Sequence, residues 1–143
     1  MKVLVAAQSG FCFGVRRALD MVRTTLAERG KPVYTFGPLI HNRSAVERLA
    51  REGALCVEEI GLFEPGQTVV IRSHGVSPEQ ERLLRERGVF LVDTTCPLVK
   101  KVQLQLSRIT SSGQFPMIIG KGDHPAVVGE IGYCGGKATV ISS

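Results

Sequence analysis

The amino-acid sequence predicts an α/β protein made of repeated βα units, with parallel sheets covered by helices and reactive turns at the carboxyl ends of the strands. Two observations favour this class. Short runs rich in Val, Ile and other apolar residues alternate with amphipathic segments of helical period. The runs are also nearly continuously hydrophobic, as expected for strands that helices cover on both faces. A length of 143 residues, 43% of them hydrophobic, suffices for a hydrophobic core.

The expected strands recur along the whole chain. They lie at residues 3–7, 33–37, 68–73, 89–93 and 116–120. Each leads through a turn with Gly, Pro, His or Cys into a helical segment, the first of which has apolar residues at Val15, Leu19, Val22 and Leu26. Glycines at positions 30, 53, 88 and 113 are expected to end the first four helices, and the fifth is expected to fade at 132–136.

Local signals place two helix starts. Ser77 is the expected N-cap of the third helix, with Pro78 in its first turn and Gln80 completing a capping box. Asp123 is the expected N-cap of the fifth helix. Residues 55–66 are less regular and suggest a short strand and a turn, and residues 137–142 suggest a last strand.

The residues with reactive side chains fall at one kind of position. The turn after each expected strand carries one of them, namely Cys12, His41, His74, Cys96 or His124. Ligands bind at this edge of open α/β sheets, because helix N-termini present free N–H groups that suit phosphate and favour thiolates. A lone histidine there is ordinarily a hydrogen-bonded cap, but five such residues on one rim favour a function. Cys56 and Cys134 lie off this pattern, and we interpret both as structural.

Composition narrows the classes of partner. The formal charge is +5, yet the basic residues are spread over helix faces without interleaved aromatic residues, so we expect no nucleic-acid partner. No apolar run approaches the length of a membrane span or a signal-peptide core, so we expect a soluble cytoplasmic protein without a membrane partner. In a reducing compartment the four cysteines are expected to be free, metal-binding or catalytic.

Five motifs carry a resemblance to a known family. They are GFCFGVRRAL at 10–19, GPLIHNRSAVERL at 37–49, SHGVSPE at 73–79, DTTCPLVKKV at 93–102 and GDHPAVVG at 122–129. In this order they resemble the 4-hydroxy-3-methylbut-2-enyl diphosphate reductases, iron–sulfur enzymes of the methylerythritol phosphate route to isoprenoids. That family is about twice as long, with three α/β units around a 4Fe-4S cluster. The resemblance implies a boundary after residue 13, a first unit at 14–96 and the start of a second at 97–143.

The resemblance also implies residue roles. Cys12 and Cys96 match two of the three cluster ligands, and the third has no counterpart in this sequence. His41 and His74 match the histidines that hold the substrate diphosphate, and His124 matches the one near the substrate hydroxyl. The implied reaction removes an allylic hydroxyl as water, with electrons from a donor such as ferredoxin or flavodoxin, and yields isopentenyl and dimethylallyl diphosphates.

One position departs from the family pattern. The family reads His-Pro-Glu, with the glutamate as proton source, where this chain has Ala126. Glu130 lies one helical turn later and is a candidate substitute acid. Two alternatives therefore stay open beside an impaired reductase: a non-catalytic relative that binds a diphosphate or an iron–sulfur cluster, and a phosphate-binding α/β module without iron.

Overall fold

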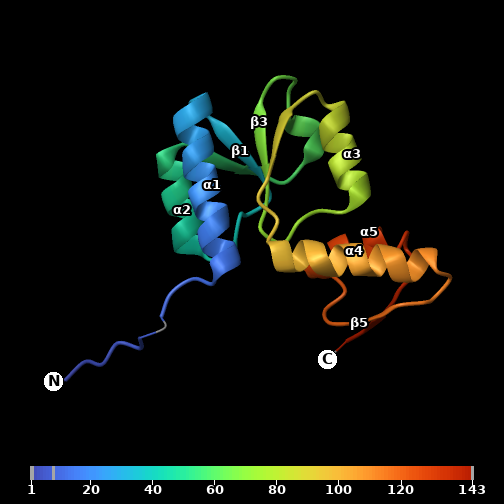
Figure 1. The fold of residues 1–143 in the computed structure, drawn as a ribbon. Coiled ribbons are helices and arrows are strands. Elements are labelled where there is room, and N and C mark those ends of the chain that lie inside the picture. The colour runs from blue at the N-terminus through green and yellow to red at the C-terminus, as the bar shows by residue number, and fades with distance from the viewer. Residues whose placement is uncertain (1, 8, 143) are drawn as a thin grey trace.

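A four-stranded parallel sheet organises the larger part of the molecule, with strand order β2-β1-β3-β4 (Figure 1). The computed structural model describes residues 2–7 and 9–142. Its helices are α1 (Phe13–Arg29), α2 (Arg43–Glu52), α3 (Pro78–Glu86), α4 (Pro97–Ser111) and α5 (Pro125–Tyr133), with a 3-10 helix η1 (Ile60–Leu62). Its strands are β1 (Val33–Phe36), β2 (Ala54–Val57), β3 (Thr68–Ile71), β4 (Phe90–Asp93), β5 (Met117–Ile119) and β6 (Thr139–Ile141).

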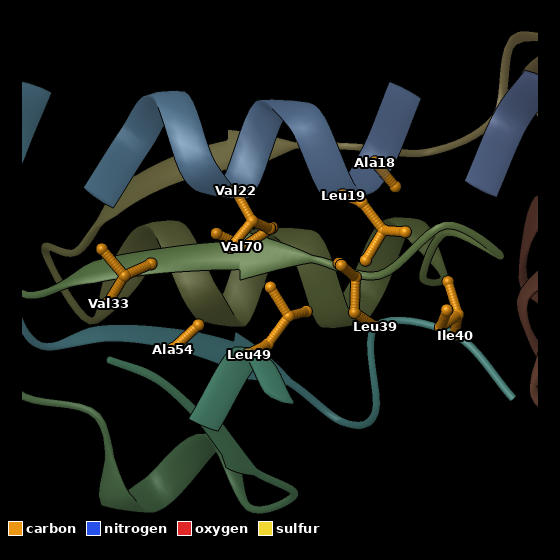
Figure 2. Close-up of a cluster of buried hydrophobic side chains, with 9 residues drawn as sticks. All are labelled: Ala18, Leu19, Val22, Val33, Leu39, Ile40, Leu49, Ala54 and Val70. Atoms are coloured by element: carbon orange, nitrogen blue, oxygen red, sulfur yellow. The ribbon is translucent and has the colours of Figure 1, made fainter. Parts of the chain in front are cut away.

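Helices cover the four-stranded sheet on both faces. Strand β3 is buried at every residue, and its side chains alternate between two hydrophobic clusters: Val70 packs toward α1 and α2, whereas Val69 and Ile71 pack toward α3 and η1. Figure 2 shows the first cluster, in which Val22 of α1 lies against Val70. The predicted α/β class with a covered parallel sheet is thus confirmed.

Residues after β4 form a second, smaller layer. Helix α4 packs against α5, and β5 pairs in parallel with β6 in a separate two-stranded sheet. Figure 1 shows α1 and α4 beginning at the same end of the large sheet, where the strands have their carboxyl ends. This end therefore collects several helix N-termini.

The capping signals are confirmed for one helix and wrong for another. Ser77 caps α3 in a full capping box with Gln80. The N-cap of α5 is His124 and not Asp123, because the helix begins at Pro125 and the residue before it supplies the acceptor.

The strand expected at residues 3–7 is also wrong. Residues 2–7 belong to no strand, and Val3, Leu4 and Val5 are 71%, 82% and 80% exposed. Figure 1 shows this segment leading away from the sheet. A strand exists only by pairing with a neighbour, and neither edge of the large sheet lies alongside these residues. No helix in the described part of the chain is long and apolar enough to cross a membrane.

Candidate functional site: a histidine cluster and two cysteines at the strand ends

The three histidines of the sequence lie together at the carboxyl ends of the strands. The ring centroids are 4.3 Å apart for His41 and His74, 5.1 Å for His41 and His124, and 6.0 Å for His74 and His124. His41 comes from the loop after β1, His74 from the loop after β3, and His124 from the start of α5. Loops far apart in sequence thus bring all three imidazoles to one place, which we call the histidine cluster.

Backbone contacts hold the loops of the histidine cluster in place. Leu39 and Ile40, just before His41, are buried in the core, which anchors that loop. The Leu39 carbonyl accepts a hydrogen bond from the Ser73 N–H over 3.1 Å, so the His41 and His74 loops are joined directly. Gly75 has a φ of +76°, a conformation that favours glycine and turns the chain immediately after His74.

His74 is held neutral by its surroundings. Burial lowers its pKa to about 4, and the charges of His41, Arg72 and His124 act in the same direction. Its Nδ1 atom is buried and has no hydrogen-bond partner. A buried nitrogen without a partner is costly, and a hydrogen bond to this atom would offset that cost.

His124 is both a helix cap and a member of the histidine cluster. Its Nδ1 atom accepts a hydrogen bond from the Ala126 N–H over 3.2 Å. An accepting Nδ1 carries no proton, so Nε2 is the nitrogen that bears hydrogen. The cap therefore sets the tautomer of His124 and makes Nε2 a donor.

Cys12 and Cys96 occupy equivalent positions, as N-cap residues of α1 and α4. Neither thiol is used as a cap, so both remain free at helix N-termini. The two starts lie close together: a Cβ built on Gly14, two residues after Cys12, would be 2.5 Å from Cys96 Sγ. Arg17 of α1 also donates to the Thr95 carbonyl over 3.3 Å. The structure thus joins the loops that carry the two predicted cysteines.

The loop before Cys96 contains residues that the sequence analysis did not single out. The Asp93 carboxylate accepts from the Thr95 N–H over 2.8 Å and from the Thr95 hydroxyl, and it pairs with Lys100. The Cys96 N–H donates to the Ser73 carbonyl over 2.9 Å, which ties this loop to the His74 loop. The signal was present in the Asp-Thr-Thr run, because an aspartate followed by threonine two residues later is typical of a side-chain-stabilised turn.

The position of Ala126 leaves Glu130 as the nearest acid along α5. Burial raises the pKa of Glu130, and the charge of His124 lowers it by less. A carboxyl with a raised pKa is closer to the protonation state that a proton donor needs. The helix places Glu130 one turn beyond Ala126.

The other two cysteines differ in exposure. Cys134 is fully buried at the end of α5, whereas Cys56 is exposed on the edge strand β2, where burial of part of the thiol raises its pKa. Within residues 2–7 and 9–142, no group of three or more His, Cys, Asp or Glu side chains is placed to hold a metal ion. Cys12 and Cys96 are thus a pair of candidate ligands without a third in that part of the chain.

Together these features define an α/β protein with an anion-suited histidine cluster and two free thiols at one edge of a parallel sheet. Over residues 3–143 the sequence matches the model of the LytB protein family, and the chain belongs to this family.

Relatives support this membership over nearly all of the chain. A 4-hydroxy-3-methylbut-2-enyl diphosphate reductase of Aquifex aeolicus is 41% identical over 99% of the chain and 50% of its own length. The reductase of that name from Dehalococcoides mccartyi is 44% identical over 96% of the chain and 48% of its own length. The chain therefore spans about half the length of these curated relatives.

Solved structures give the same result for the fold. A structure of (E)-4-hydroxy-3-methyl-but-2-enyl diphosphate reductase superposes with a TM-score of 0.86 at 41% identity, covering 99% of this chain and 51% of the other. A reductase structure from Plasmodium falciparum gives a TM-score of 0.91 at 27% identity, covering 94% of this chain and 42% of the other. In both cases this chain matches only part of a longer chain, namely 51% and 42% of it.

Proposed function

We propose that this chain is the N-terminal half of a 4-hydroxy-3-methylbut-2-enyl diphosphate reductase, which removes the allylic hydroxyl of its diphosphate substrate to give isopentenyl and dimethylallyl diphosphates. The observation that carries the proposal is the histidine cluster, because three imidazoles within 6.0 Å of one another form a site for a highly charged anion. The identity to reductases over nearly all of the chain supports the same substrate.

In this proposal His41 and His74 bind the diphosphate. Helix α2 begins two residues after His41 and α5 begins directly after His124, and both helix N-termini add positive dipole ends. His124, whose Nε2 carries hydrogen, is the donor toward the hydroxyl end of the substrate. Glu130 is the candidate proton donor in place of the missing glutamate.

Cys12 and Cys96 would hold a 4Fe-4S cluster as two of its ligands. The fit rests on their free thiols at helix N-termini and on the contact of Gly14 with Cys96, and the described residues offer no third ligand. When bound, such a cluster supplies electrons and a Lewis-acidic iron for the hydroxyl oxygen. A donor such as ferredoxin or flavodoxin would reduce it, and the reducing cytoplasm would keep both thiols free.

The sheets are consistent with the proposed units at 1–13, 14–96 and 97–143. The large sheet ends with β4, and β5 and β6 pair only with each other in the described part of the chain. Residues 2–7 contribute no strand to either sheet. We propose that 1–13 and 97–143 belong to units that the other half of the protein completes.

Anaerobic reconstitution with iron and sulfide tests the cluster. We expect a visible absorbance band that weakens strongly in Cys12→Ser and in Cys96→Ser. Cys56→Ser is the matched control, because Cys56 is also exposed but lies within the edge strand β2 and not at a helix N-terminus. A colourless wild-type chain, or a band that all three variants retain, would contradict the cluster assignment and favour a phosphate-binding module without iron.

A second candidate function is binding of a diphosphate or an iron–sulfur cluster without turnover. Ala126 favours it, because loss of a positioned general acid costs about 10² to 10⁴ in rate. Turnover of the allylic diphosphate by the reconstituted chain separates the two candidates. We expect residual activity that falls further in Glu130→Gln if Glu130 is the substitute acid. Complete absence of turnover, also with Ala126→Glu and with the second half supplied, would favour the binding function.

A further inference from the structure

Positive charges on neighbouring side chains of the histidine cluster repel one another at the distances that the structure shows. His41 and His74 have ring centroids 4.3 Å apart, and Arg72 and His124 also act on His74 with their charges. Two adjacent imidazolium ions beside a guanidinium repel one another unless an anion lies against them. The free site is thus arranged to hold the His74 imidazole in its neutral form.

The hydrogen bonds of the ring nitrogens show which histidine can take up a proton without losing a contact. His74 Nδ1 is buried without a hydrogen-bond partner, whereas His124 Nδ1 is already occupied by the Ala126 N–H. Protonation of His124 at Nδ1 would break the cap of α5. Protonation of His74 breaks no hydrogen bond at Nδ1 and makes both ring nitrogens donors, so that Nδ1 can donate to a phosphate oxygen whichever tautomer the neutral ring has.

We propose that an anion bound in the histidine cluster brings one proton onto His74, so that uptake of the diphosphate and uptake of a proton from solvent are coupled. The inference rests on the proposed function, since it assumes that the cluster is the diphosphate site. The proton moves from water or buffer to His74, and the resulting imidazolium donates to the anion. The site thereby gains a positive charge only when its ligand is present, which favours highly charged ligands over weakly charged ones.

The coupling between anion binding and protonation of His74 predicts how the affinity for the anion depends on pH. The neighbours that face His74 are His41 from the loop after β1, Arg72 from the end of β3, and His124 from α5, and they lower its pKa to about 4 together with burial. A ligand that binds the protonated site more tightly than the neutral site loses affinity about tenfold per pH unit above this value, until the pKa of the anion-bound imidazole is reached. Affinity should therefore fall as the pH rises.

Sulfate is the probe, because its charge does not change between pH 5 and 8. Isothermal titration calorimetry of residues 1–143 in buffers of different ionisation enthalpy measures the protons taken up per sulfate bound. We expect uptake near one proton at pH 6, and loss of most of that uptake in His74→Asn. Arg48→Gln on α2 is the control for a change in net charge, since Arg48 is exposed and pairs only with Glu52 among the described residues.

Imidazole NMR gives a second readout that folding defects cannot imitate. All three histidines of the sequence lie in the cluster, so every imidazole signal reports this site. We expect sulfate to shift the His74 ring nitrogens to the values of an imidazolium while His124 keeps its tautomer.

Two results would overturn the inference, and only one of them would also refute the proposed diphosphate site. Sulfate binding without proton uptake would refute the coupling and leave the proposed diphosphate site intact. Failure of sulfate, and of diphosphate itself, to bind at any pH from 5 to 8 would refute the anion site and the coupling with it.

Discussion

The Nδ1 atom of His124 accepts a hydrogen bond from the N–H of Ala126, two residues further along the chain, over 3.2 Å. This contact makes the histidine a helix cap, and because the cap uses only one ring nitrogen, it is compatible with a further role for Nε2. It also places Ala126 at the first turn of α5, which has no acidic residue there.

Substitution of Ala126 by Glu should therefore stabilise the chain. A carboxylate at the N-terminus of α5 interacts favourably with the helix dipole, and we expect the free energy of unfolding to rise by about 0.3–1 kcal/mol. Urea denaturation of Ala126→Glu and of the uncharged control Ala126→Gln measures the effect of the charge alone. Equal stability of the two variants at low salt would contradict this prediction.

The low pKa of His74 predicts a pH-dependent stability. The unfolded chain binds a proton on this side chain near pH 6.5, whereas the folded chain does so only near pH 4. The unfolded state thus holds more protons between these values, so this residue's contribution to stability is present above pH 6.5 and is lost as the pH falls toward 4.

Denaturation of wild type and His74→Asn across pH 4 to 7 measures this contribution. We expect the wild-type free energy of unfolding to fall more steeply on acidification than that of the variant. A constant difference between the two proteins over the whole range would show that His74 is not held neutral by the fold.

Gly14 is predicted to control the position of the Cys96 thiol. A Cβ at this residue would lie 2.5 Å from Cys96 Sγ and 3.0 Å from its Cβ, so Gly14→Ala must turn the thiol away. We expect a loss of stability of about 1 kcal/mol, since the overpacking is partly offset by the better helix propensity of alanine. The main effect should be a weaker cluster absorbance after reconstitution.

Gly122→Ala is the matched control for this change. Its Cβ would meet only Val140 Cγ1, at an ordinary distance of 3.9 Å. If both variants reconstitute to the same absorbance, the contact between Gly14 and Cys96 does not position a cluster ligand.

Gln103 of α4 has a buried amide group that destabilises the folded chain, and substitution of this residue should raise the stability. Its side chain is 2% exposed, lines a cavity of about 310 Å³, and has an Nε2 atom without a hydrogen-bond partner. An unsatisfied buried donor costs about 1–3 kcal/mol, so Gln103→Met should raise the free energy of unfolding by about 1 kcal/mol. Gln105→Met, an exposed position on the same helix, should change it little. A loss of stability in Gln103→Met alone would show that the amide has a partner in solution.

Much of the fold could be predicted because it depends on patterns among residues that are close in sequence. Buried strands such as β3 are hydrophobic at consecutive positions, and Ser77 with Gln80 forms a capping box whose residues are adjacent in sequence. Two local predictions were wrong for different reasons. Residues 3–7 have strand composition but no neighbouring strand, and Asp123 is a good cap one residue away from where α5 begins.

The sequence by itself determined which residues stand at the turns after the strands, because the order of apolar runs and breakers is a local property. Only the tertiary structure decided how close they come. The parallel order β2-β1-β3-β4 brings the His41 and His74 loops together, and α4 carries the chain on to α5 and His124. The electrostatics of His74 and the contact of Gly14 with Cys96 depend on distances between residues remote in sequence, and such distances arise only when the elements pack.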